Sequence, residues 1–138
     1  MCKFAELPDD AQVGLFLSLA DRAKDYFSRD EYKTITENVL EKCWKWLEDK
    51  DVSETQLYRL IDSPEENDII CVQETAEGQD LKIWDCVIYA VAYTCKKAYE
   101  HNGNEYFPQP IEIVDAEYYS KSKFIYEQLL SGQDTKSE

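Results

Sequence analysis

The sequence predicts an all-α protein: a single compact multi-helix domain with a proline-containing extended segment packed across it. Apolar residues recur every three or four positions in nearly every apolar segment, which is the spacing of one helix face. The chain has 138 residues, a length typical of one domain, and only 4 Gly and 4 Pro, too few for the many tight turns of a β-sandwich. We expect five to seven helices in one domain, residues 1–138, with residues 1–8 and 131–138 frayed.

Two long helices are expected in the first third of the chain. Asp9 and Asp10 can cap a helix that ends near residues 28–29. Asp30 then begins a second helix that ends around Asp49. The residues expected to face the core are Val13, Phe16, Leu17, Ala20, Ala23, Tyr26 and Phe27 in the first helix, and Tyr32, Ile35, Val39, Cys43, Trp46 and Leu47 in the second.

Two short helices should follow. Ser53 and Gln56 form a capping-box signature for a third helix. The sequence SPEEND, residues 63–68, has a serine that can cap a helix, a proline in the first turn and acids beside the positive helix end. This favours a fourth helix through Val72. The run IICV, residues 69–72, could instead be a strand, because periodicity does not decide over four residues.

The stretch WDCVIYAVAYTCKKAYEHNG, residues 84–103, predicts a central core helix, and EHNG supplies its C-terminal stop. The uncharged run from Cys86 to Cys95 is ten residues long. A membrane-spanning helix needs roughly 20 apolar residues, so we expect no membrane anchor. The expected core face comprises Leu81, Trp84, Val87, Ile88, Val91, Cys95 and Ala98.

The chain changes character after Gly103. In NEYFPQPIEIVDAEYY, residues 104–119, two prolines separated by one residue favour an extended segment. Its apolar residues suit packing across the helices. Asp115 is then expected to cap a final helix, whose apolar and aromatic residues include Tyr118, Tyr119, Phe124, Ile125, Leu129 and Leu130.

No residue constellation in the sequence indicates an enzyme. The single histidine excludes a two-histidine metal site, and Cys95 and His101 are six positions apart, about 120° off a common helix face. There is neither a phosphate-binding loop nor a nucleophile elbow. We therefore expect no catalytic residues, no metal and no cofactor.

The cysteines favour a reducing compartment. They are odd in number, widely spaced and lack a CxxC pair, and the N-terminal sequence does not resemble a secretory signal. A cytoplasmic protein with five free thiols is the expectation. These thiols belong to Cys2, Cys43, Cys71, Cys86 and Cys95.

The net charge of −14 is concentrated in one block. Residues 48–80 contain eleven acids and only two bases, Lys50 and Arg59. Nucleic acid and anionic membranes would be repelled, so the natural counterpart is a basic protein. The simpler interpretation is that the charge only keeps the domain soluble.

Four segments together resemble the sixth immunity-protein family of bacterial polymorphic-toxin systems. They are DDAQVGLFLSLADR, CWKWLEDKDVSETQLYRLID, WDCVIYAVAYTCKKAYE and FPQPIEIVD, and the resemblance runs from about Leu7 to Leu130. It implies a small, all-α, cytosolic protein that binds and inactivates a toxin domain, often a nuclease, encoded beside it. The family provides no catalytic residues to carry over. The positions expected to maintain the fold are Trp44, Trp46, Trp84, Pro108 and Pro110.

The sequence thus predicts an immunity protein that inhibits a basic toxin, possibly a nuclease, by stoichiometric binding. The alternative is an acidic helical adaptor or regulatory protein for an unrelated basic partner. The oligomeric state stays open. The predicted contact surface lies in the acidic block, with Tyr58 as an aromatic anchor, and comprises Tyr58, Asp62, Glu65, Glu66, Asp68, Glu74, Glu77 and Asp80.

Overall fold

The computed structural model describes residues 4–63, 68–103, 111 and 114–136. This part of the chain is helical and contains no strand, so the all-α prediction is confirmed. The elements are η1 (Phe4–Glu6), α1 (Asp9–Ala23), η2 (Lys24–Tyr26), α2 (Asp30–Asp49), α3 (Glu54–Ile61), α4 (Ile69–Gln73), α5 (Gln79–His101) and α7 (Glu117–Lys136).

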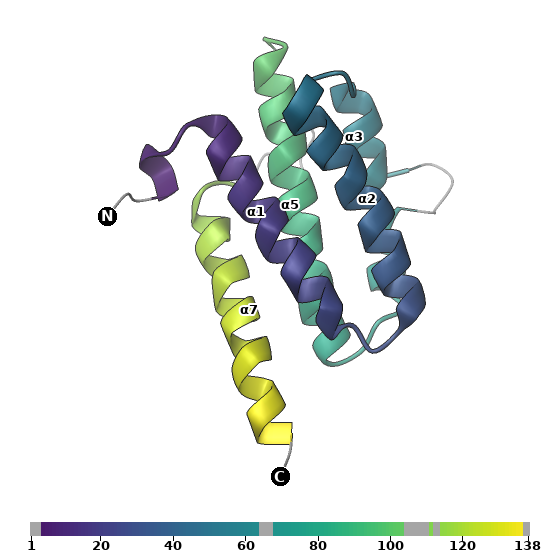
Figure 1. The fold of residues 1–138 in the computed structure, drawn as a ribbon. Helices are drawn as coiled ribbons and strands as arrows, with labels where there is room; N and C mark the ends of the chain where they lie inside the picture. The colour runs from purple at the N-terminus through teal and green to yellow at the C-terminus, as the bar shows by residue number, and fades with distance from the viewer. Residues whose placement is uncertain (1–3, 64–67, 104–110, 112–113, 137–138) are drawn as a thin grey trace.

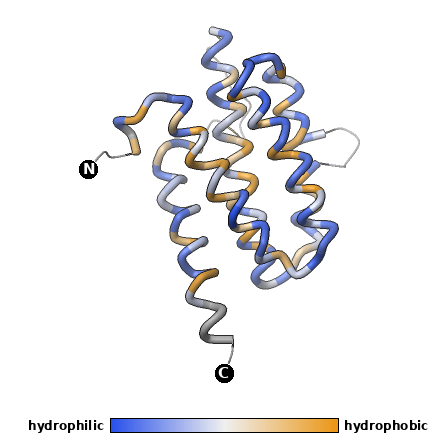
Figure 2. Tube along the Cα trace, viewed as in Figure 1, coloured by the Kyte–Doolittle hydropathy of each residue, from blue (hydrophilic) through white to orange (hydrophobic). Residues whose placement is uncertain are grey.

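Helix α5 is the centre of the bundle. It contacts α1, α2, α3, α4 and α7, with α7 on one side and the α2–α3 pair on the other (Figure 1). Hydrophobic and hydrophilic segments alternate along the helices, as expected for amphipathic helices around a common core (Figure 2). Within the described residues, no helix is long and apolar enough to cross a membrane.

The middle of α5 is buried on all sides. Every residue from Ala90 to Cys95 is at most 3% exposed, which explains why this run carries no charge. Trp84 is fully buried, and its ring centroid lies 5.0 Å from that of Phe27 and 5.5 Å from that of Tyr32. Leu81 was expected in the core but is 39% exposed. It lies in the first turn of α5, where Asp80 and Ile83 are buried and Leu81 faces outward.

The helix starts follow local chemistry, with one difference in α1. The Ser53 capping box of α3 is present with both of its hydrogen bonds. In α1, however, Pro8 occupies the N-cap position, and no side chain caps the helix. Asp9 and Asp10 lie instead in the first turn, where their charge favours the positive helix end.

The IICV run is helical, because it forms most of α4. The expected cap at Ser63 is wrong, since α4 begins after Asp68. The Asp68 carboxylate accepts hydrogen bonds from Cys71 N at 2.9 Å and from Ser63 N at 2.7 Å. One carboxylate therefore both caps α4 and ties the helix to the end of α3.

Helical residues lie near both ends of the chain. Phe4, in η1, stacks on Tyr119 with ring centroids 4.5 Å apart, and α7 continues to Lys136. Asp115 accepts a hydrogen bond from Glu117 N at 3.0 Å, at the start of α7. Pro108 and Pro110 lie outside the described residues, so the packing of the proline segment stays a prediction.

Four cysteines lie in the described part of the chain, and all four are free thiols: Cys43, Cys71, Cys86 and Cys95. Burial raises the pKa of Cys43 and of Cys86 to about 12. Burial also raises the pKa of Cys95. Because the thiolate is the nucleophile, these three residues suit the core better than chemistry.

We expect five alkyl labels per chain in the denatured, non-reduced protein, measured by intact mass. In the native protein at pH 8, peptide mapping should show faster labelling of the half-buried Cys71 than of the buried Cys43, Cys86 and Cys95. Two or four missing labels in the denatured sample would indicate disulfides. Equal native rates at all four positions would contradict the burial argument.

Candidate interaction surface

The eight predicted contact residues fall into three groups. Asp62, Glu74 and Glu77 are exposed, and Tyr58 is partly exposed. Asp68 and Asp80 are buried, with 4% and 6% exposure. Glu65 and Glu66 lie outside the described residues. The acidic block is therefore partly a surface and partly a set of internal hydrogen-bond acceptors.

Tyr58 and Asp62 form one exposed unit at the end of α3. The Tyr58 hydroxyl donates to Asp62 Oδ2 at 3.1 Å. Burial, together with this hydrogen bond, raises the pKa of Tyr58 to about 12, so the hydroxyl stays protonated near neutral pH. The pair presents an aromatic ring beside a carboxylate. Such a combination can contact both apolar and cationic groups of a protein partner.

Glu74 and Glu77 lie on the connection between α4 and α5. The chain turns there through Gly78, whose φ of 58° is in the region that favours glycine. Glu31, near the start of α2, is also exposed and lies 3.6 Å from Arg29 Nε. The same end of the bundle thus carries several exposed carboxylates.

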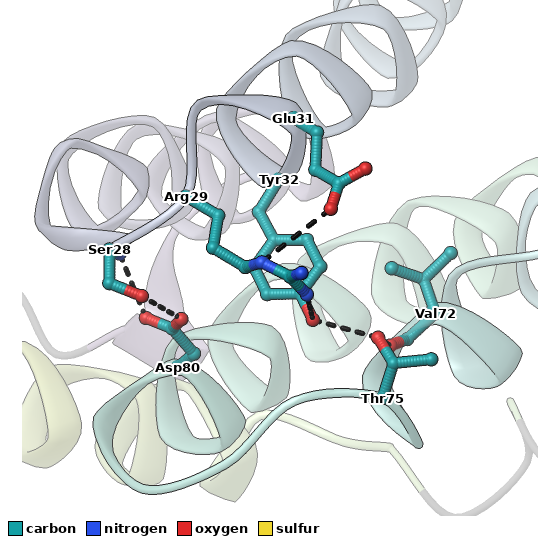
Figure 3. Close-up of polar contacts among 7 residues, drawn as sticks. All are labelled: Ser28, Arg29, Glu31, Tyr32, Val72, Thr75 and Asp80. Carbon is teal, nitrogen blue, oxygen red and sulfur yellow. Dashed lines mark hydrogen bonds and ion pairs between the residues drawn. The ribbon is translucent and has the colours of Figure 1, made fainter.

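Asp80 ties this end of the bundle together. Its Oδ1 accepts a hydrogen bond from Ser28 N at 3.0 Å, and its Oδ2 accepts one from the Ser28 hydroxyl (Figure 3). Ser28 lies in the turn before α2, so one carboxylate joins that turn to the start of α5. The pair is separated by 52 positions, and nothing in the sequence predicts it.

A second chain of hydrogen bonds runs beside Asp80. The Thr75 hydroxyl donates to Val72 O at 2.7 Å and also lies 2.7 Å from the Tyr32 hydroxyl, which must then be the donor to Thr75 (Figure 3). Arg29 Nη1 donates to the Tyr32 hydroxyl at 3.0 Å. These hydrogen bonds therefore fix the connection between α4 and α5, which carries Glu74 and Glu77. A hollow of about 450 Å³ lies between these side chains and Asp80.

The carboxylates of this surface offer charge and hydrogen-bond acceptors. No group of three His, Cys, Asp or Glu side chains within the described ranges could hold a metal ion. Cys95 is fully buried and donates to Glu54 O at 3.6 Å, whereas His101 is exposed and packs edge-on to Trp46. These two residues do not form a nucleophile–base pair in the described structure.

The chain matches the model of a known protein family. The model of a family described as immunity protein Imm6 matches residues 11–129 of the chain. No curated protein and no solved structure matches it. The matched range includes the acidic block, residues 48–80, with its exposed Asp62, Glu74 and Glu77. It also includes all of α5.

Proposed function

Because the chain belongs to the Imm6 family of immunity proteins, we propose that it neutralises its toxin by stoichiometric binding, without catalysis. Membership of the family carries this proposal, since an immunity protein implies a cognate toxin partner. The toxin that we propose is a basic nuclease. A net charge of −14 suits a partner whose own substrate is polyanionic.

The proposal has a simple electrostatic basis. A nuclease presents a basic surface to nucleic acid, so an acidic inhibitor can be steered onto that surface and exclude the substrate. Fast encounter matters because the toxin acts inside the cell that makes it. We place this encounter in the cytoplasm, which agrees with the free thiols of the described cysteines.

The proposed contact surface is narrower than the sequence predicted. It keeps the exposed Asp62, Glu74 and Glu77, with Tyr58 as the aromatic anchor, and Glu65 and Glu66 remain part of the proposal. Asp68 and Asp80 are not part of the proposed surface, because both are buried and hydrogen-bonded within the chain. A charge reversal at Asp68 would remove the α4 cap, at a cost of about 0.5–2 kcal/mol, and would not report on binding alone.

Co-expression with the neighbouring toxin domain tests the function. The chain should restore growth to cells that make the active toxin, and it should co-purify in a fixed ratio with an inactive form of that toxin. Continued toxicity in cells that contain folded chain, with no complex on co-purification, would refute the proposal.

The charge reversal Glu74→Lys with Glu77→Lys should slow association with the toxin and flatten its salt dependence, because exposed charges chiefly govern encounter. We expect an association rate about tenfold lower at low salt, measured by stopped-flow or surface plasmon resonance.

The matched control is Glu6→Lys with Glu117→Lys. Both residues are exposed, lie on η1 and at the start of α7, which pack against each other through Phe4 and Tyr119, and give the same change in net charge. Equal slowing by both double variants would show that only net charge matters, and the proposed surface would be wrong.

A further inference from the structure

A groove between α2 and α3 differs in chemistry from the rest of this acidic molecule. The two helices lie side by side (Figure 1), and the groove encloses about 680 Å³. Its wall includes the half-buried Ile35, Val52 and Leu60, with the buried Val39 and Ile69 also contributing. This volume lies within the range of about 300–1,000 Å³ that is usual for binding pockets.

Cations outnumber the single carboxylate, Asp51, at the rim of the groove. Lys42 and Lys45 project from α2 and Arg59 from α3, and all three side chains are exposed. None of the three forms an ion pair with any residue that the structure describes.

The absence of ion pairs between these cations and the described residues is informative because carboxylates are plentiful elsewhere. The chain has 29 acids against 15 bases. Lys24, Lys50 and Lys97 each approach a carboxylate oxygen to within 3.3 Å. At the groove, three cations and one carboxylate, Asp51, instead surround an apolar wall. The excess of cations is complementary to a ligand that is both apolar and anionic.

We propose that this groove binds a segment of the toxin in which a large apolar side chain is flanked by carboxylates. The inference rests on the proposed function and adds a second contact of opposite polarity to the acidic surface. The apolar side chain would cover Ile35, Val52 and Leu60, while the carboxylates would reach Lys42, Lys45 and Arg59. The acidic surface governs the rate of encounter, and the groove governs how long the complex lasts.

The sign of the charge makes the proposal testable. Lys42→Glu with Lys45→Glu makes the chain more acidic, which by general electrostatics should strengthen binding to a basic toxin. If the groove binds an acidic segment, the same two substitutions should weaken binding instead. We expect binding to an inactive form of the neighbouring toxin domain to weaken about tenfold or more, chiefly through faster dissociation.

Two further variants make this comparison clean. Lys121→Glu with Lys123→Glu changes two exposed lysines on α7 and alters the net charge equally, so it should not weaken binding. Lys42→Gln with Lys45→Gln removes the groove cations without adding acids and should weaken binding in the same direction. Circular dichroism and thermal melts establish that each variant is folded.

The outcomes separate the two proposals. If the wild-type chain fails to bind the toxin, the proposed function and the groove both fall. If the wild type binds and the groove variants bind equally well, or lose no more than the α7 variant, the groove proposal alone is wrong. A wild-type dimer that the groove variants dissociate, seen by light scattering, would assign the groove to a second copy of the chain and also overturn it.

Discussion

Trp84→Ala is expected to lower the free energy of unfolding by about 3–5 kcal/mol, the largest loss that we predict for a single substitution. Trp84, on α5, is fully buried against the rings of Phe27, in the turn before α2, and of Tyr32, in the first turn of α2. Alanine would leave a cavity that this close-packed centre can fill only in part. Small domains are stable by about 5–15 kcal/mol, so the variant should be marginally folded. Urea denaturation followed by far-ultraviolet circular dichroism measures the loss.

The indole nitrogen of Trp84 allows a second substitution to be compared with alanine. Among the described residues, Trp84 Nε1 is buried without a hydrogen-bond partner. Trp84→Phe therefore keeps an aromatic ring and removes an unpaired donor, so it should cost about 1–3 kcal/mol, less than alanine. Trp44→Ala is the control, because Trp44 is 36% exposed and its loss should cost about 1 kcal/mol or less. Similar losses for Trp84→Ala and Trp44→Ala would contradict the position of Trp84 at the centre of the core.

The sequence predicted what is encoded locally. The start of α2 at Asp30, its end at Asp49 and the Ser53 capping box all depend on residues within a few positions of one another. The apolar spacing of α5 likewise identified the central helix. It did not show that Asp80 and Ile83, rather than Leu81, are the buried residues at the start of this helix, so Leu81 was misplaced. Periodicity identifies a helix face, whereas burial also depends on which neighbouring elements cover that face.

The candidate surface was harder to predict because acidic side chains have two common uses. Most are exposed, and composition alone therefore placed Asp68 and Asp80 on the surface. The structure uses both as acceptors for backbone N–H groups, one as a helix cap and the other across 52 positions of chain. The sequence did not reveal the groove either, because its residues come from two different helices. Lys42 on α2 and Arg59 on α3 line the same groove only when the two helices pack.

Asp80→Ala should lower the free energy of unfolding by about 2 kcal/mol, because it removes the acceptor for both Ser28 donors. Asp80→Asn keeps one carbonyl oxygen and should lose less. Glu77→Ala, three residues earlier and exposed, should change stability by about 0.5 kcal/mol or less. Urea denaturation of the three variants tests the division between structural and surface acids, since Glu77 should act on toxin association and Asp80 on folding. If Asp80→Ala is as stable as Glu77→Ala but slows association with the toxin, Asp80 belongs to the contact surface.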